Sequence, residues 1–314
     1  MHRLGYCIML LSSGIGLEVS AYPKPGNVHR LVDHEDTWFE DFIITSNVFT
    51  YWLYRGAVRG YYKRYNRYTI GDLVYHIVKD SMLITGGGNT CLGSSLLLTP
   101  LSLSIGELLS ERNEIDINDL VRMACSIVEK YSTVYDTIMF YKAIRKASPS
   151  YIKVTDETHY YPNVWSPSYQ EEILRGNISL WRILKYSSRT DIVAGEVVNC
   201  YKASIDAMKF LSNRLAYHRA WNRAIVETYL YLLSKTRDTV ITRKYGLDLA
   251  ENVMELAKYI LDKVIVAGKE WINIVMDFDR KLQSMNFNPG SIADLTASAI
   301  SLYSLWRKRS ILRI

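Results

Sequence analysis

Apolar and polar residues alternate with a helical period along most of this 314-residue chain. Residues 251–264 show it clearly, because apolar side chains recur at i, i+3, i+4 and i+7 and would form one buried stripe. Residues 118–131 repeat the pattern behind two possible caps, Asp116 and Asn118. The same periodicity predicts helices over 38–62, 71–84, 168–186, 190–212, 217–235 and 291–308.

Strand signals are scarce, since the most β-branched stretch, VITRKY at 240–245, is short and runs into a glycine. The pattern therefore predicts an all-α protein, a single compact multi-helix domain over 1–314 with short irregular connections. One longer irregular stretch, at about 148–168, contains prolines that interrupt any periodicity. Because it is also rich in aromatic residues, we expect a packed loop there instead of a solvated linker between domains.

The N-terminal run GYCIMLLSSGIGLEVSA is apolar, but Glu18 and several Ser and Gly residues dilute it, and it is short for a membrane span. We expect a buried first helix and no membrane partner. The net charge of +6 is mild and its basic residues are scattered, which argues against nucleic acid and suits anionic small molecules. The four cysteines form no CxxC pair, which predicts a reduced, cytoplasmic protein without a disulfide framework or zinc site.

The first segment with candidate chemistry is YPKPGNVHR at 22–30. Its prolines fix φ and its glycine permits a sharp bend, so we expect a stiff surface turn. Such a turn would display Lys24, Asn27, His29 and Arg30. Cations beside the acids of the following HEDTWFED suit a ligand that carries phosphates and a metal, although an ordinary surface loop has the same composition.

Within HEDTWFED, His34 and Asp36 have the spacing of a metal-ligand pair, but such a pair is more often a hydrogen-bonded loop contact. Asp36 and Glu40 would face one cation if residues 36–41 began a helix. The plainer interpretation is an acidic first turn that faces solvent.

A glycine-rich segment, TGGGNTCLG at 85–93, precedes an apolar helix that Asn89 or Thr90 can cap. Backbone amides around Gly87 and Gly88, together with a helix N-terminus, suit an anion. The segment matches neither the P-loop nor the dinucleotide fingerprint, so on its own a tight turn between helices explains it better.

Two later segments combine acids with cations or turns. RDTVITRKYG at 237–246 offers Asp238, Arg243 and Lys244 around a short extended piece, where Arg could grip a phosphate and Lys act as a point charge. NFNPGSIADL at 286–295 is a second Asn-Pro-Gly turn before a helix whose first turn holds Asp294. Their plainer interpretations are a solvated charge run and an acid that complements the helix dipole.

Taken in order, these segments resemble the triphosphoribosyl-dephospho-CoA synthase family from about Glu18 to Leu295. The matching pieces are EVSAYPKPGNVHR, HEDTWFEDF, GGGNTCLG, AIVETYLYLLSKTRDTVITRKYG and FNPGSIADLTA. The resemblance implies an all-helical fold that joins the triphosphoribosyl unit of ATP to the ribose 2'-hydroxyl of 3'-dephospho-CoA and releases adenine.

That reaction is a substitution at an anomeric carbon, which needs a base, help for the departing purine and neutralisation of a triphosphate. As acids or Mg²⁺ ligands the resemblance suggests Asp36, Asp238 and Asp294, of which Asp36 and Asp294 are expected to share Mg²⁺. For nucleotide and phosphate binding it suggests Lys24, Gly26, Asn27, Arg30, Gly87, Gly88, Asn89, Thr90, Arg243 and Lys244.

The chain departs from the pattern of the bacterial lyase pathways at His29, at Cys91-Leu92 and after Asp238, as a divergent, archaeal-style member would. At these positions that pattern has an Asp, a His-Lys pair and an Asn-Val-x-x-Arg-Gly-Gly run. Two alternatives therefore remain: ATP-dependent (phospho)ribosyl transfer to a different acceptor in another cofactor pathway, and a non-catalytic nucleotide-binding protein.

Overall fold

A computed structural model of the protein describes residues 1–112, 114–152 and 160–308. These residues form helices and no strand, with an isolated antiparallel bridge between His29 and Val32. The all-α prediction is confirmed. The helices are α1 (His2–Ser20), α2 (Phe39–Tyr61), α3 (Gly71–Thr85), α4 (Leu92–Glu111), α5 (Ile117–Tyr131), α6 (Val134–Ala147), α7 (Tyr169–Arg175), α8 (Leu180–Ser187), α9 (Ile192–Val198), α10 (Lys202–His218), α11 (Trp221–Leu233), α12 (Thr239–Tyr245), α13 (Leu247–Val266), α14 (Trp271–Ser284) and α15 (Gly290–Arg307).

Two of the predicted long helices are each divided in two. The segment 168–186 becomes α7 and α8, which are separated around Asn177, where φ is +46°. The segment 190–212 becomes α9 and α10, because Cys200 and Tyr201 both adopt positive φ. Ordinary side chains rarely take that conformation, and the periodicity of the flanking residues does not reveal it.

The stretch 240–245 was expected to be extended, and this expectation is wrong. It lies in α12, where the side chain of Asp238 accepts a hydrogen bond from the backbone N–H of Ile241 and caps the helix. The cap at the start of this helix of seven residues outweighs the weak β preference of its branched residues. Of the irregular stretch 148–168, residues 148–152 and 160–168 contain no helix, and 153–159 lie outside the described residues.

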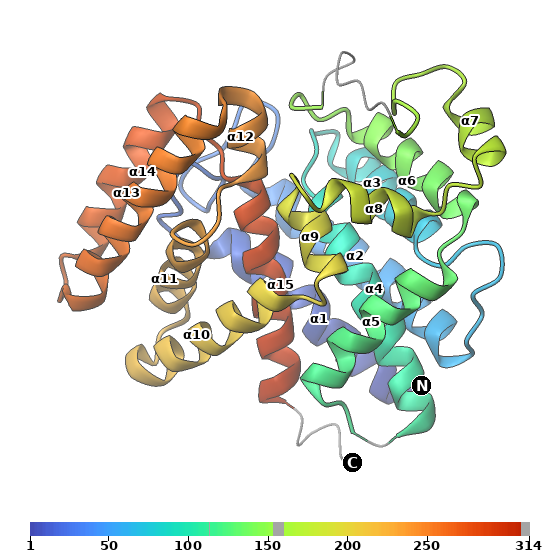
Figure 1. Ribbon diagram of the computed structural model, residues 1–314. Helices are drawn as coiled ribbons and strands as arrows, with labels where there is room; N and C mark the ends of the chain where they lie inside the picture. Colours follow the sequence, from blue (N-terminus) through green and yellow to red (C-terminus); the bar gives the residue numbers. More distant parts are fainter. Residues whose placement is uncertain (113, 153–159, 309–314) are drawn as a thin grey trace.

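Helices α4 and α15 form the centre of the molecule. Figure 1 shows α15 running between α10–α14 on one side and the helices from the first half of the chain on the other. It packs on α1, α4, α10 and α11, while α4 packs on α2, α3 and α5. Helix α4 is long and apolar enough to span a membrane, but 89% of that apolar window is buried in the protein, so it is a core helix.

Glycines allow these central helices to approach closely. A Cβ on Gly60 would lie 1.9 Å from the carbonyl oxygen of Leu103, and one on Gly106 would lie 1.9 Å from that of Ala57, so α2 and α4 touch backbone to backbone. A Cβ on Gly14 of α1 would lie 2.1 Å from the hydroxyl of Ser301 and 2.5 Å from the carbonyl oxygen of Ala297, both in α15. The turn after α1, the glycine segment before α4 and the start of α15 lie together in one region, where they line a common cavity.

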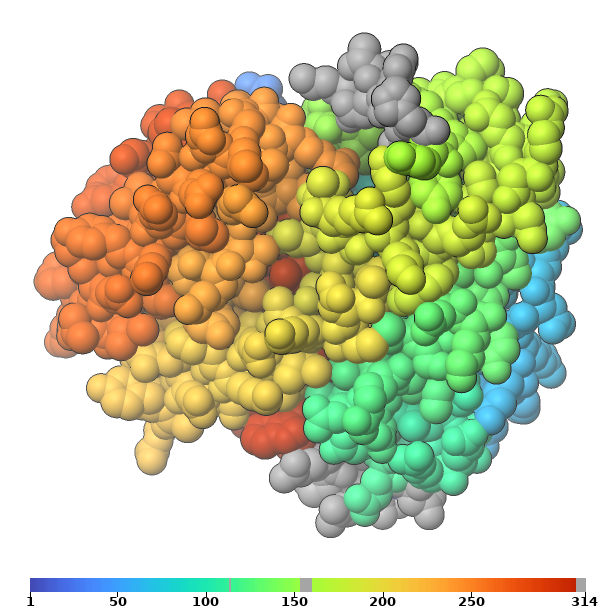
Figure 2. Space-filling view, viewed as in Figure 1, coloured from blue at the N-terminus to red at the C-terminus, as the bar shows by residue number. Residues whose placement is uncertain are grey.

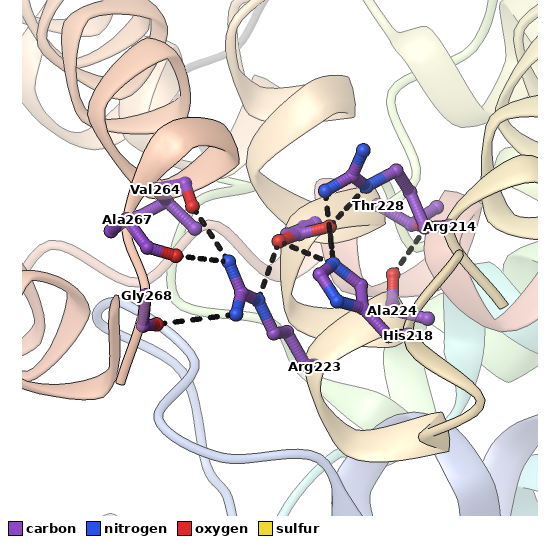
Figure 3. Close-up of polar contacts among 9 residues, drawn as sticks. Arg214, His218, Arg223, Ala224, Thr228, Val264, Ala267 and Gly268 are labelled. Carbon is purple, nitrogen blue, oxygen red and sulfur yellow. Dashed lines mark hydrogen bonds and ion pairs between the residues drawn. The ribbon is translucent and has the colours of Figure 1, made fainter. Parts of the chain in front are cut away.

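A buried carboxylate holds the helices of the second half together (Figure 3). Glu227 of α11 accepts hydrogen bonds from Arg214, from Nε of Arg223 at 2.9 Å and from Nε2 of His218 at 3.0 Å. Arg223 also donates to the carbonyl oxygens of Val264, Ala267 and Gly268 at the end of α13. One carboxylate therefore ties α10, α11 and α13 into a unit.

Candidate active site

Two cavities meet where the turn after α1, the glycine segment and the start of α15 come together. The polar cavity has a volume of about 640 Å³ and is lined by the turn at 26–28, residues 33–37, the glycine segment and residues 283–294. The apolar cavity, of about 520 Å³, is lined mainly by α6, α8, α9 and residues 151–152 and 162–164. Both cavities are lined by Leu92, Gly93, Tyr151 and Asp294. Figure 2 shows a furrow between the orange and the yellow-green helices, with the red α15 visible inside it.

Asp294 lies at the junction of the two cavities. Its Oδ1 accepts a hydrogen bond of 2.5 Å from the hydroxyl of Ser94, and its Oδ2 would lie 2.0 Å from a Cβ at position 93. The absence of a side chain at Gly93 therefore makes room for this carboxylate. Burial raises the pKa of Asp294 to about 7; the nearby carboxylates of Glu18 and Asp238 add to the rise, while Ser94 opposes it.

Asp36 lies at the other end of the glycine segment. The backbone N–H of Gly88 donates to the carbonyl oxygen of Asp36 at 2.6 Å, and a Cβ on Gly88 would lie 2.8 Å from its Oδ2. Its side chain is exposed and lines the polar cavity. Since α2 begins at Phe39, Asp36 precedes the helix, and the helical pairing with Glu40 considered from the sequence is wrong.

The glycine segment carries its own helix start. The side-chain oxygen of Asn89 accepts hydrogen bonds from the backbone N–H groups of Cys91 and Leu92, as a capping residue does. Thr90 is buried and shares a hydrogen bond of 2.9 Å with Thr45. Gly88, Asn89 and Thr90 line the polar cavity, whereas Gly87 packs on the carboxylate of Asp41 and does not line it.

The turn at 22–30 is buried, although the sequence suggested a surface turn. Asn222 and Tyr229 of α11 bind the backbone of Tyr22 and Pro25, and Asp279 of α14 binds the backbone N–H of Gly26 at 2.9 Å. Packing against two later helices explains why the surface expectation is wrong for Lys24, Asn27 and His29, which are at most 5% exposed. Asn27 donates to Asn288 at 2.9 Å and lines the polar cavity.

Lys24 is fully buried, and its ammonium donates to Oε1 of Glu18 at 2.5 Å. Burial lowers the pKa of Lys24 and raises that of Glu18, and the attraction between the two opposes both shifts. Glu18 lines the polar cavity, so the pair lies directly behind its wall. His29 pairs with Asp279 at 3.0 Å, while Arg30 is exposed and stacks on Tyr22 outside the cavity.

The three predicted site residues at α12, Asp238, Arg243 and Lys244, lie in three different surroundings. Asp238 is buried and accepts hydrogen bonds from the backbone N–H groups of Ile241 and Ile292, so one carboxylate joins the starts of α12 and α15. Burial raises its pKa to about 6. Arg243 lines the apolar cavity, with Nη2 at 3.3 Å from Asp191, and Lys244 lines the polar cavity.

Carboxylates dominate the polar cavity. Its charged lining consists of Glu18, Asp33, Glu35, Asp36 and Asp294, with Lys244 as the lysine and His34 as the histidine. Burial lowers the pKa of His34, which disfavours its charged form. No group of three or more His, Cys, Asp and Glu side chains that could hold a metal occurs among the described residues.

Three residues at this site were missed in the sequence. Glu18 was not considered as a site residue, although it interrupts the apolar N-terminal run and begins a matching segment, and Ser94 and Tyr151 were not considered at all. Ser94 lies just after the quoted glycine segment and Tyr151 inside the irregular stretch. The sequence around Ser94 and Tyr151 has no local pattern that marks them as site residues. Their place in the site depends on the nearby Asp294, which is distant from both in the sequence.

Comparisons with known proteins identify the family to which the chain belongs. A solved structure from Archaeoglobus fulgidus, provisionally assigned as a triphosphoribosyl-dephospho-CoA synthase, is similar to the protein with a TM-score of 0.59 and 26% sequence identity. The similarity covers 83% of this chain and 97% of that one. A search among curated proteins finds no match. A family model described as ATP:dephospho-CoA triphosphoribosyl transferase matches residues 8–311. Because that match spans nearly the whole chain, the protein is a transferase that belongs to the ATP:dephospho-CoA triphosphoribosyl transferase family.

Proposed function

We propose that the protein joins the triphosphoribosyl group of ATP to the ribose 2'-hydroxyl of 3'-dephospho-CoA where the two cavities meet, with Asp294 as the base. The hydroxyl oxygen forms a bond to the anomeric carbon, the bond from that carbon to the purine breaks, and adenine leaves with its electron pair. The proton lost by the hydroxyl passes to Asp294 and is balanced by the proton that adenine takes up.

The observation that carries this proposal is the position and acidity of Asp294. A general base is most effective when its pKa lies near the working pH, and burial raises the pKa of Asp294 to about 7. The carboxylate lines both cavities, so a hydroxyl from one side and a ribose from the other can meet beside it. The hydrogen bond from Ser94 fixes its orientation.

The polar cavity suits the triphosphate. Gly88, Asn89 and Thr90 line it near the start of α4, where the helix dipole favours an anion. Lys244 adds positive charge from α12, and Asn27 adds an amide group. Lys24 and Arg30 do not line this cavity. Their contacts with phosphate remain predictions, and they would require the ligand to reach these two side chains from outside the cavity.

Magnesium fits the donor set of the polar cavity. Its carboxylates would repel a bare triphosphate, and Mg²⁺ is usually held by one or two carboxylates together with phosphate oxygens and water. Such a site needs no preformed cluster of protein ligands. Asp36 is the candidate ligand, and the ion would neutralise the phosphate charge. Asp294, which the sequence suggested as the second ligand, is assigned here to the base, because one carboxylate cannot hold the ion and accept the proton at the same time.

The test is to incubate the protein with ATP, Mg²⁺ and 3'-dephospho-CoA and to measure free adenine and the mass of the joined product. Asp294→Asn should lower kcat by roughly 10²- to 10⁴-fold, the usual contribution of a general base, without changing ATP binding. Full activity in Asp294→Asn would contradict the role of the base. No adenine release with any acceptor, despite ATP binding, would favour the non-catalytic alternative.

One observation favours a second candidate, transfer to a different acceptor. Where related enzymes of the bacterial lyase pathways tend to carry a His-Lys pair, this chain has Cys91, which is buried, and Leu92, which lines both cavities. The junction is therefore more apolar than a lysine would make it. Adenine release with another hydroxyl acceptor, and none with 3'-dephospho-CoA, would support this second function.

A further inference from the structure

The apolar cavity differs sharply from its neighbour in chemistry. Its walls include aliphatic side chains of Ile144, Ile183, Leu184 and Val193. The charged residues of its lining are Arg243, Asp191 and Asp294, and Arg243 already lies 3.3 Å from Asp191. Transfer of a multiply charged triphosphate into such surroundings would be strongly unfavourable. The cavity therefore suits a long, weakly polar ligand with at most a small anionic end.

We infer that the apolar cavity binds the pantetheine arm of a CoA-like acceptor, with Arg243 facing the phosphate end of that arm. This inference rests on the proposed function. The volume of about 520 Å³ falls within the usual range of small-molecule sites. The arm consists of methyl groups, uncharged amides and a thiol, which match aliphatic walls. An acceptor held in this way extends toward Asp294, where its ribose would meet the donor.

Arg243 is suited to this contact. Its side chain is 28% exposed and that of Asp191 is 23% exposed, so the pair is accessible from the cavity. A guanidinium group can keep one carboxylate contact and still bind a phosphate oxygen with another N–H group. The alternative occupant is the purine of ATP, to which Phe140, Tyr141 and Tyr151 offer ring contacts. A single purine would nevertheless leave much of a cavity of about 520 Å³ unfilled.

The inference can be tested by calorimetry without turnover, with pantetheine and 4'-phosphopantetheine as ligands and no ATP. Ala194 is 3% exposed and lines the cavity, so Ala194→Phe should fill it and weaken both ligands at least tenfold. Mg²⁺-ATP binding should not change in this variant. Val266→Phe adds the same side chain at a position that is 84% exposed and outside both cavities, and it should bind both ligands normally.

A second variant keeps the test decisive if Ala194→Phe fails to fold. Arg243→Gln should weaken 4'-phosphopantetheine by roughly ten- to hundredfold, because a charge-assisted hydrogen bond is lost, and leave pantetheine unchanged. Equal affinities in the wild type and both variants, or displacement of pantetheine by free adenine, would overturn the inference.

These measurements also separate this inference from the proposed function. Pantetheine binding that depends on the cavity, combined with no adenine release from ATP, would refute only the reaction. Adenine release with 3'-dephospho-CoA, combined with pantetheine binding that ignores both variants, would refute only the assignment of the cavity.

Discussion

The carboxylate of Asp294 lies against Gly93, so closely that a Cβ at position 93 would fall 2.0 Å from Oδ2. The two residues belong to α15 and α4, the two central helices, and they meet at the junction of the cavities. A small change at position 93 should therefore displace the proposed base without touching it chemically.

We expect Gly93→Ala to lower kcat by about 100-fold, since a displacement of about 1 Å in an active site can cost this much. Extra volume in a packed site also costs about 1–3 kcal/mol of stability. Gly5→Ala is the matched control, because nothing lies within 4 Å of a Cβ there and alanine favours the helix. Adenine release and thermal midpoints measured on both variants check this; equal kcat values would contradict the prediction.

The pH dependence of turnover should follow Asp294. The base acts when it is deprotonated, so kcat/KM should rise with pH through about 7 and level off above it. Ser94→Ala should move this rise to higher pH, because the Ser94 hydrogen bond lowers the pKa of Asp294. If kcat/KM rises at the same pH in Ser94→Ala as in the wild type, the group that titrates is not Asp294.

Removal of the Lys24 ammonium should destabilise the protein. In Lys24→Ala the carboxylate of Glu18 would remain buried without its partner, which costs about 3–5 kcal/mol in comparable cases. The double variant Lys24→Met with Glu18→Gln leaves no charge behind and should recover part of that loss. Urea unfolding measures both; an unchanged free energy of unfolding in Lys24→Ala would mean that the pair is not formed in solution.

Asp36→Asn should raise the Mg²⁺ concentration needed for half-maximal turnover and leave the thermal midpoint nearly unchanged, because its side chain is exposed on the rim of the polar cavity. Chelation of Mg²⁺ should abolish adenine release in the wild type. The matched control is Asp116→Asn, since Asp116 caps α5 outside the cavity. An identical Mg²⁺ requirement in the wild type and Asp36→Asn would exclude Asp36 as a ligand.

The burial of His218 beside two arginines predicts a pH dependence of stability. Burial lowers the pKa of His218 from 6.5, with Arg223 and Arg214 contributing and Glu227 opposing, so the unfolded chain binds the proton more readily than the folded one. The free energy of unfolding should therefore fall as the pH drops below about 6.5. The thermal midpoint of His218→Asn should fall less between pH 7.5 and about 5.5 than that of the wild type. A wild-type midpoint that rises over this interval would contradict the sign.

Much of the fold could be predicted from the sequence, because one-sided apolar stripes such as that of 118–131 reflect the burial of each helix. The breaks at Asn177 and Cys200 could not, since a positive φ at these residues leaves no mark on the apolar periodicity of the flanking helices. For the site, the turns and glycines indicated which segments approach one another. The burial of Lys24 could not be predicted, because it depends on α11 and α14, which are far away in the sequence.

The packing of α1 against α15 also has a consequence for biosynthesis. A ribosome adds about 5–20 residues per second, so α1 and α4 wait on the order of tens of seconds before α15 emerges. During that time the Gly14 side of α1 and the part of α4 that packs on α15 lack their permanent cover and offer apolar surface to chaperones or to other nascent chains. A chain that terminates before Asp294 would lack both this cover and the proposed base, so incomplete synthesis should yield material that aggregates or is degraded instead of a partly active enzyme.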